Sequence, residues 1–569
     1  MKPQAVSRAG RAGLWRRAAL RARRARAAST LGAAGVLLLL VVLLALPALE
    51  IPWSLIDDAT HAIERPRLML QALHEGRWVG SLYDHPGVIV TEFEGGRFRP
   101  VGWLYFMITY ALLGDAPALH HAWRFVLLAI TALCIFSAAC NLSHSVVAAF
   151  LSALFAILFA PGLEGVYRLS PQELPLATLQ AAGLAALALL YRRLRDGPRR
   201  AALNCALFVA ALAAFTLAIG AKESALAFAA FLFGLLALAR AAEGFPSGWR
   251  WRRWLAPLAG VVLLGHVACL VLIAVNNMVG QGYAAQYGAG GVAVALRNGL
   301  WYCWTLLRNY GLFLIVGVAA FLPRLWGAWR ARRRLDERAY WQIACLLWCA
   351  AGVILQSPFR TLIERYIAPF TLGLALFLGL EWGRLLTAQT RRRVLVRALA
   401  GVAAALFLWE TLASANATFQ QLAARDTSSY QATQYLAGHV APGGIVWVNL
   451  ASDGEMGEFR HGIERVLRIV WQRPDIVIKA LDEVGLEACC TPGDWVALWA
   501  HAANIDSAAV QRRFGARAEL RAAYNHRTQR IWSPGAALEK ALLEGPLKLP
   551  NRAPQGTEAY DWHLLLIGN

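Results

Sequence analysis

The chain has 569 residues, of which 58% are hydrophobic and only 16% are charged. Soluble proteins carry about a quarter charged residues, so this composition excludes an ordinary soluble enzyme and indicates a polytopic membrane protein. The formal net charge of +21 is concentrated in short segments between apolar stretches, and this distribution argues against a nucleic-acid partner.

Residues 1–30 form a basic tail with nine lysines and arginines and no acid. The first apolar stretch, 31–49, is longer than the apolar region of a secretory signal peptide, and the residues near Ala48 make a poor cleavage site. We therefore expect this stretch to be a retained signal anchor.

Eleven apolar stretches predict a mainly α polytopic protein with about 11 transmembrane helices, since most approach the roughly 20 residues needed to cross a hydrocarbon layer. They cover residues 31–49, 118–140, 145–161, 174–191, 201–220, 223–240, 254–275, 304–323, 339–356, 364–380 and 395–415. The middle parts of these stretches are almost free of charge.

The basic tail and four segments between the stretches contain 29 basic and four acidic residues. All five segments lie on one side if the tail is cytoplasmic and each stretch crosses once, which is the positive-inside pattern. We expect an integral protein of the bacterial inner (plasma) membrane, with its N terminus cytoplasmic and its C terminus extracytoplasmic.

The first outer segment, 50–117, is too long for a simple connection and begins with the acidic pair Asp57-Asp58. A carboxylate at a membrane border can serve as a general base, or hold a divalent cation (Mg²⁺ or Mn²⁺) beside a phosphate. The alternative is that Asp58 only caps a helix starting at Ala59. Further along, 101–113 is apolar but short, which favours an interfacial helix over a span.

A short outer turn carries Glu164, Arg168, Gln172 and Glu173 between the third and fourth stretches. Arg168 could grip a lipid phosphate with both arms of its guanidinium, and Glu173 could orient it or bind a sugar hydroxyl. The competing interpretation is an ion pair between Arg168 and either Glu164 or Glu173.

Other isolated cations stand at outer ends of stretches, as an anionic lipid headgroup requires. Lys222 is the only lysine of the membrane body and precedes Glu223, with which it could pair instead. Arg360 and Arg365 flank the turn before the tenth stretch. With Arg168 they make four candidate ligands for a phosphate.

The chain divides into the tail 1–30, a membrane body 31–415 and a polar segment 416–569. Within the last, 443–449 and 494–499 read as strands, and 463–471 and 507–514 as helices. We expect a small extracytoplasmic α/β domain there.

Together these features resemble the GT-C superfamily of membrane glycosyltransferases, which includes protein O-mannosyltransferases and aminoarabinose transferases. The resemblance rests on the early acidic pair, the long first outer loop with its short helix, Arg97-Phe98-Arg99-Pro100 ahead of that helix, the 164–173 turn and Lys222-Glu223-Ser224.

The resemblance implies inverting transfer of a sugar from a polyprenyl-phosphate donor to a glycan, lipid or protein acceptor on the outer face. It makes Asp57 or Asp58 the base, and Arg168, Lys222 and Arg365 ligands of the carrier phosphate. Arg360 joins these as a phosphate ligand. The expected substrate-binding residues are Arg97, Arg99, Glu164, Gln172, Glu173 and Glu223.

Three other functions stay open at this point. A transporter or flippase would place ionisable residues near the membrane midplane. An O-antigen polymerase or ligase would more typically have its largest loop late in the chain, whereas a scaffold protein would need no acidic pair.

Overall fold

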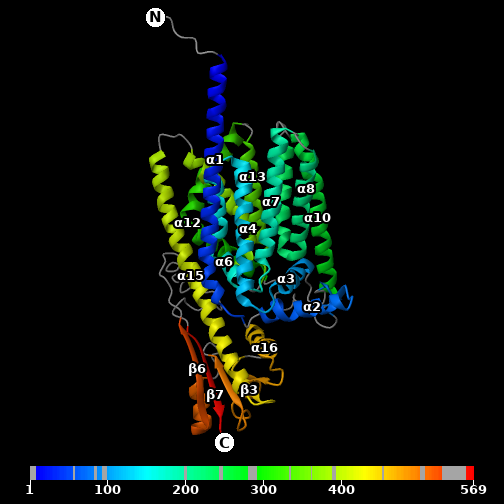
Figure 1. Ribbon diagram of the computed structural model, residues 1–569, viewed down its shortest axis with the longest axis vertical. Coiled ribbons are helices and arrows are strands. Elements are labelled where there is room, and N and C mark those ends of the chain that lie inside the picture. The colour runs from blue at the N-terminus through cyan, green and yellow to red at the C-terminus, as the bar shows by residue number, and fades with distance from the viewer. Residues whose placement is uncertain are drawn as a thin grey trace.

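A computed structural model describes residues 8–54, 58–81, 86–91, 99–197, 201–241, 248–279, 291–331, 335–359, 362–387, 393–450, 454–499, 506–527 and 559–568. Helices dominate, and most run side by side in one bundle (Figure 1). The bundle consists of α1 (Arg8–Ala45), α4 (Pro117–Ser143), α5 (Val146–Ile157), α6 (Ala160–Tyr167), α7 (Glu173–Asp196), α8 (Ala201–Ala221), α9 (Phe228–Ala241), α10 (Gly248–Val279), α12 (Gly291–Arg330), α13 (Glu337–Gln356), α14 (Ala368–Thr387) and the first part of α15 (Arg393–His439).

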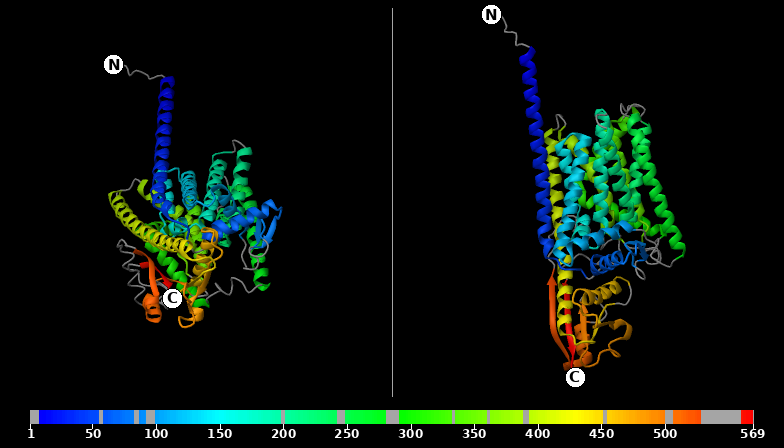
Figure 2. Two further views of the ribbon diagram at one scale, coloured as in Figure 1. Left: turned by 60° about the horizontal axis from the view of Figure 1, so that its bottom comes forward. Right: turned by 45° about the vertical axis from the view of Figure 1, so that its right-hand side comes forward.

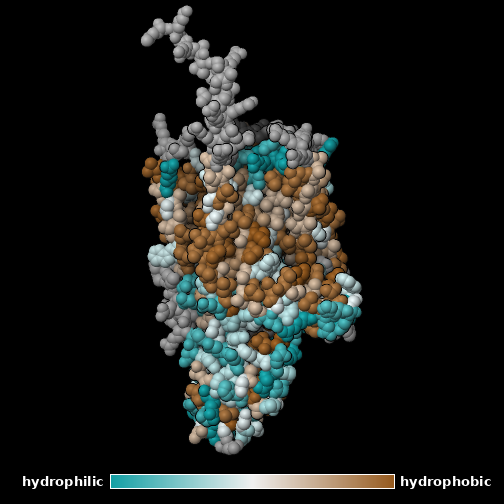
Figure 3. Space-filling model, viewed as in Figure 1, coloured by the Kyte–Doolittle hydropathy of each residue, from teal (hydrophilic) through white to brown (hydrophobic). Residues whose placement is uncertain are grey.

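Among the described residues, nine helices are long and apolar enough to cross a membrane. A tenth span appears if α5 and α6, which meet at an angle of 59°, are counted as one. The remaining predicted span, 223–240, corresponds to the shorter apolar helix Glu223–Leu238. This segment starts as a 3-10 turn, η4 (Glu223–Ala227). The polytopic, mainly α class is confirmed, and Figure 3 shows hydrophobic residues gathered over the bundle on the face in view.

The first outer segment lies across one end of the bundle (Figures 1 and 2). It follows η1 (Leu46–Glu50) and contains the π-helical turn η2 (Ala59–Glu64), α2 (Arg65–His74), a two-stranded sheet of β1 (Val79–Ser81) and β2 (Ile89–Thr91), and α3 (Pro100–Leu113). The predicted short apolar helix is therefore present as α3, which is too short to be counted as a span.

Small residues let α5 and α14 approach closely. A Cβ added to Gly379 would meet Ser152 Oγ at 2.0 Å, and one added to Gly383 would meet the Ala148 Cβ at 2.4 Å. Such small-residue contacts are a common means of packing helices in membranes, where water does not drive association.

The last part of the chain forms a five-stranded sheet at the same end as the first outer segment (Figure 1). The strand order is β4-β3-β5-β7-β6, with β3 parallel to β4 and β5, and β7 antiparallel to β5 and β6. These strands are β3 (Ile445–Val448), β4 (Val477–Ala480), β5 (Trp495–Trp499), β6 (Ala518–Arg527) and β7 (Ala559–Ile567). The accompanying helices are α16 (Gly454–Ile469), α17 (Leu481–Val484) and α18 (Ser507–Phe514), with η6 (Gly515–Arg517) after α18. The two predicted strands and two predicted helices are all present.

One helix joins the bundle to this sheet. α15 runs for 47 residues without a proline, and its C-terminal half packs against β6 and β7. The division predicted between 415 and 416 falls inside this helix, and it stays a prediction. Because the helix is continuous, residues in its C-terminal half hold a fixed position beside the first outer segment.

Contacts between α16 and η2 also hold the sheet region against the bundle. Arg468 pairs with Glu64, and Arg465 Nε lies 3.9 Å from Glu64 Oε2. Beneath these charges Trp53, Ile63, Leu169 and Ile469 form one buried apolar cluster.

Candidate active site

Asp58 is buried, with 2% of its surface exposed, at the start of η2. Its side chain does not cap that helix, so the capping alternative is wrong for Asp58. Instead, the Ser54 N–H donates to Oδ2 at 3.1 Å and the Ser170 N–H donates to Oδ1 at 2.9 Å. The carboxylate thus ties the first outer segment to the turn after α6. Its predicted partner, Asp57, lies outside the described residues.

The surroundings of Asp58 suit a proton acceptor. Burial, with a smaller contribution from the nearby charge of Asp426, raises the pKa of Asp58 to about 7. The two backbone amides and Arg168 act in the opposite direction and do not outweigh these effects. A carboxylate with a pKa near the working pH is the form that general base catalysis favours.

A second carboxylate reaches this site from α15. Ser54 Oγ donates to Asp426 Oδ1 at 3.1 Å, and Arg425 Nη2 donates to Ser54 Oγ at 3.1 Å. Arg425 Nε also donates to Asp426 Oδ1 at 2.8 Å. Ser54 therefore stands between two buried aspartates that are 368 positions apart in the sequence.

Arg168 lies two residues from the amide that binds Asp58. Its one ion pair among the described residues is with Glu164, at 3.5 Å, and its buried Nε has no partner there. Burial, together with the charges of Arg365 and Arg425, lowers the pKa of Arg168. A buried guanidinium with so little compensation favours the approach of an anion.

The backbone of the turn that carries Arg168 is hydrogen-bonded by a second arginine, Arg124. Arg124 of α4 is 1% exposed and donates to the carbonyl oxygens of Leu169, at 3.2 Å, and Gly165. These bonds satisfy carbonyls that the end of α6 leaves free and fix the backbone on both sides of Arg168.

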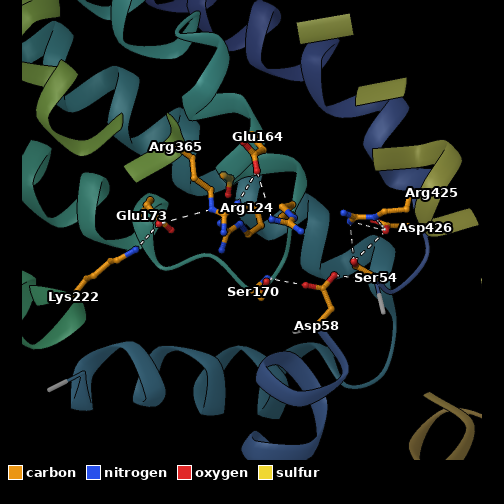
Figure 4. A network of polar contacts seen from close by, with 12 residues as sticks. Ser54, Asp58, Arg124, Glu164, Ser170, Glu173, Lys222, Arg365, Arg425 and Asp426 are labelled. Carbon is orange, nitrogen blue, oxygen red and sulfur yellow. Dashed lines mark hydrogen bonds and ion pairs between the residues drawn. The ribbon is translucent and has the colours of Figure 1, made fainter. Parts of the chain in front are cut away.

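Charges of alternating sign continue from Glu164, the partner of Arg168, through Arg365 and Glu173 to Lys222 (Figure 4). Arg365 Nη1 donates to Glu164 Oε1 at 2.7 Å, and Arg365 Nε lies 3.9 Å from Glu173 Oε1. Glu173 also pairs with Lys222, whose Nζ stands 4.0 Å from the centre of the Tyr366 ring. These ion pairs form a network of five predicted site residues, Glu164, Arg168, Glu173, Lys222 and Arg365. The Ser170 amide, two residues beyond Arg168, binds the sixth, Asp58.

The other predicted site residues either pair outside this network, are buried, or lie outside the described residues. Arg99 Nε donates to Glu223 Oε1 at 2.9 Å, so these two pair with each other, and Lys222 pairs with Glu173 instead of Glu223. Gln172 is buried beside Gly102. Arg97 and Arg360 lie outside the described residues. The functional roles of all these side chains stay predictions.

An ion pair joins the predicted spans 304–323 and 395–415. Arg308 Nε and Glu410 Oε1 are 3.6 Å apart, and both side chains are largely buried. The pair lies one turn before the non-helical Gly311 of α12. Since the two charges compensate each other, the pair gives no sign of an ion path.

The described residues alone do not form a divalent cation site. They contain no group of three His, Cys, Asp or Glu side chains suited to a metal ion. Both oxygens of Asp58 accept backbone amides, and Asp426 is paired with Arg425. The predicted Mg²⁺ or Mn²⁺ therefore has no complete set of ligands here, and it stays a prediction because Asp57 lies outside this set.

Comparison of the structure with solved structures finds three informative likenesses. ArnT from Cupriavidus metallidurans matches at 16% identity and a TM-score of 0.45, over 86% of this chain and 95% of that chain. An oligosaccharyltransferase from Archaeoglobus fulgidus matches at 14% identity and a TM-score of 0.47, over 78% and 63%. The arabinofuranosyltransferase AftD from Mycobacteria matches at 14% identity and a TM-score of 0.45, over 94% and 41%.

All three are membrane glycosyltransferases of the GT-C superfamily, the class that the sequence resembles. No family model and no curated protein matches the chain. Because every TM-score is below 0.5, these likenesses carry no weight for the function, which has to be argued from the site.

Proposed function

We propose that this protein is an integral-membrane glycosyltransferase that moves a sugar from a polyprenyl-phosphate donor to an acceptor hydroxyl on the extracytoplasmic face. The observation that supports this most is the joining of a buried carboxylate, Asp58, to an incompletely neutralised arginine, Arg168, through the turn at Ser170. Base and cation are the two groups that such a transfer requires.

The carboxylate would start the reaction. Asp58 removes the proton from the acceptor hydroxyl, whose oxygen attacks the anomeric carbon of the sugar. The bond from that carbon to the phosphate oxygen breaks, and the electron pair leaves with the polyprenyl phosphate. One displacement of this kind inverts the anomeric carbon.

The arginines would stabilise the leaving group. Charge develops on the phosphate as the bond breaks, and fixed guanidinium groups in a site with little water stabilise such charge strongly. Arg168 and Arg365 both contact Glu164, so this single acid is shared between two cations. Lys222 is more fully compensated, since Glu173 and the Tyr366 ring both contact it.

The position of the site suits a lipid-borne donor. The network lies where helices α6, α7 and α14 begin or end, level with the first outer segment. A phosphate headgroup at the membrane border can reach these residues while its polyprenyl chain stays in the hydrocarbon layer. The cytoplasmic N terminus and extracytoplasmic C terminus belong to the same proposal.

The experiment measures turnover of lipid-phosphate sugars by purified protein in detergent or vesicles. A panel of radiolabelled polyprenyl-phosphate sugars is supplied with a membrane extract as the source of acceptors, and sugar transfer is compared between wild type and Asp58→Asn. The matched control is Asp115→Asn, because Asp115 pairs with Arg67 at the surface, 2.7 Å away, and stays outside the network.

We expect Asp58→Asn to lose transfer by about 100-fold or more, in the range typical of a missing general base, while donor binding persists. Asp115→Asn should retain activity. Equal transfer by wild type and Asp58→Asn would exclude Asp58 as the base. Movement of intact donor across vesicles without transfer would favour the flippase alternative instead.

A further inference from the structure

A polar cavity lies at the end of the bundle away from the candidate active site. It has a volume of about 320 Å³ and lies between the α4–α5 turn, the start of α13 and the end of α14. The rings of Trp53 and His120, 5.1 Å apart, place the first outer segment at the first turn of α4, whereas Ser143 ends that helix and lines the cavity. A 27-residue helix extends about 40 Å, so the two sites are at opposite membrane borders.

No carboxylate is among the described residues that line this cavity. Its charged and polar side chains are those of Ser143, His144, Ser145, Arg338, Arg384 and Thr387. Arg338 Nη2 donates to the Ser143 carbonyl oxygen at 2.7 Å, which holds the guanidinium across the α4–α5 turn. In the part of the chain that the structure describes, no carboxylate pairs with Arg338.

The acids around the cavity are committed to other arginines. Glu381 pairs with both Arg384 and Arg324, and Asp336 lies 3.3 Å from Arg324. Glu337 lies 3.6 Å from Arg195, which in turn contacts His144. Arg195 also pairs with Asp196, which in turn lies 3.6 Å from Arg192. Five arginines thus face four acids, and Arg338 is the arginine left without an acidic partner among the described residues.

The backbone around the cavity favours an anion as well. Ser145 is the N-cap of the 12-residue helix α5, and its Oγ accepts from the Ala148 N–H at 3.2 Å. The positive end of the α5 dipole therefore opens toward the cavity. Gly383 packs closely on Ala148, and both of these small residues line the cavity.

We propose that this cavity binds a phosphoryl group, supplied by the headgroup of an anionic phospholipid in the adjacent leaflet. A guanidinium such as that of Arg338 can donate parallel N–H groups to two phosphate oxygens, and basic pockets between helices at this border suit anionic headgroups. The cavity uses none of the residues assigned to sugar transfer, so the inference does not depend on the proposed function.

Purified wild-type protein and the variants Arg338→Gln and Arg330→Gln are tested for binding of phosphatidylglycerol in mixed micelles, with phosphatidylcholine as the zwitterionic comparison. Arg330 is an exposed arginine of the same basic face, with its guanidinium 4.8 Å from the Trp326 ring, and serves as the matched control. A second arm tests competition by inorganic phosphate, which carries the same group without a lipid. Thermal unfolding checks that each variant folds.

We expect Arg338→Gln to weaken phosphatidylglycerol binding about fivefold, the loss typical of one arginine near an anionic surface. Arg330→Gln should change it less than twofold, and phosphatidylcholine should show no difference among the proteins. If inorganic phosphate displaces phosphatidylglycerol, the cavity binds the phosphoryl group from a soluble source as well. If it does not, the cavity requires the lipid headgroup. Equal losses in Arg338→Gln and Arg330→Gln, or no loss in either, would overturn the proposal.

Discussion

Replacing Asp58 by asparagine should change the stability of the protein in a way that depends on pH. Burial raises the pKa of Asp58 from 3.8 to about 7, so the folded protein holds this proton more tightly than the unfolded chain does. Between these two pH values the folded state binds more protons, and stability must fall as pH rises. The cost of the buried charge reaches its full size above pH 7. Asparagine carries no such charge.

The size of the effect follows from the shift. Each pKa unit corresponds to about 1.4 kcal/mol, so the carboxylate costs the fold about 4 kcal/mol at pH 8 and about 2 kcal/mol at pH 5. Asparagine loses one of the two hydrogen bonds from Ser54 and Ser170, but that loss is the same at every pH. Relative to wild type, Asp58→Asn should therefore gain about 2–3 kcal/mol of stability between pH 5 and pH 8.

The assay is thermal unfolding in detergent, followed at several pH values for wild type, Asp58→Asn and the surface control Asp115→Asn. For a chain of this length a gain of that size raises the unfolding midpoint by about 2 °C, on the per-residue entropy of globular proteins. A difference between Asp58→Asn and wild type that stays constant with pH, or that falls as pH rises, would refute the assigned surroundings of Asp58.

Three other changes test separate parts of the structure. Arg168→Gln should weaken binding of undecaprenyl phosphate by about 10- to 100-fold, the usual loss for a hydrogen bond to a charged group, as measured by titration in detergent. The substitution Glu64→Arg should lower the unfolding midpoint slightly, and adding Arg468→Glu should restore it. The interaction free energy between the two positions should be about 0.2–1 kcal/mol, because the pair is partly exposed. Gly379→Val should destabilise the protein by about 1–3 kcal/mol or more, since its Cβ would meet Ser152, and thermal unfolding would show this.

Each of these predictions has a matched control. Arg67→Gln removes an arginine outside the network and should leave undecaprenyl phosphate binding unchanged; equal weakening would remove Arg168 from the phosphate site. No recovery in the double exchange would mean that α16 does not dock on η2 in solution. Gly401→Ala should be tolerated because nothing lies within 4 Å of an added Cβ. An equal loss of stability in Gly401→Ala would mean that close packing of α5 on α14 does not explain the effect of Gly379→Val.

Much of the fold could be predicted because hydropathy is a local property. The apolar stretches, the short helix after Arg99 and the strands around Trp447 and Trp495 are each visible within a window of 10 to 20 residues. Two departures have local causes too: α6 carries Pro161 in its first turn, where the third span bends, and Glu223 begins a 3-10 turn before α9.

The site could be predicted only in part, because side-chain pairing over long separations leaves no local pattern. Asp426 lies among polar residues of α15, and only the continuity of that helix brings it to Ser54. Arg124 lies near the start of a predicted span, where its sequence context is that of a membrane anchor. Only the structure shows that it donates to the carbonyl oxygens of Gly165 and Leu169. The one signal available beforehand was the rarity of an arginine so close to an outer helix end.

The most direct test is an experimental structure of the protein with undecaprenyl phosphate bound. The phosphate should lie within hydrogen-bond distance of Arg168 or Arg365, with the Asp58 carboxylate facing the same space. A phosphate bound among other residues, or a bound state in which Asp58 and Arg168 face separate surroundings, would contradict the proposed site.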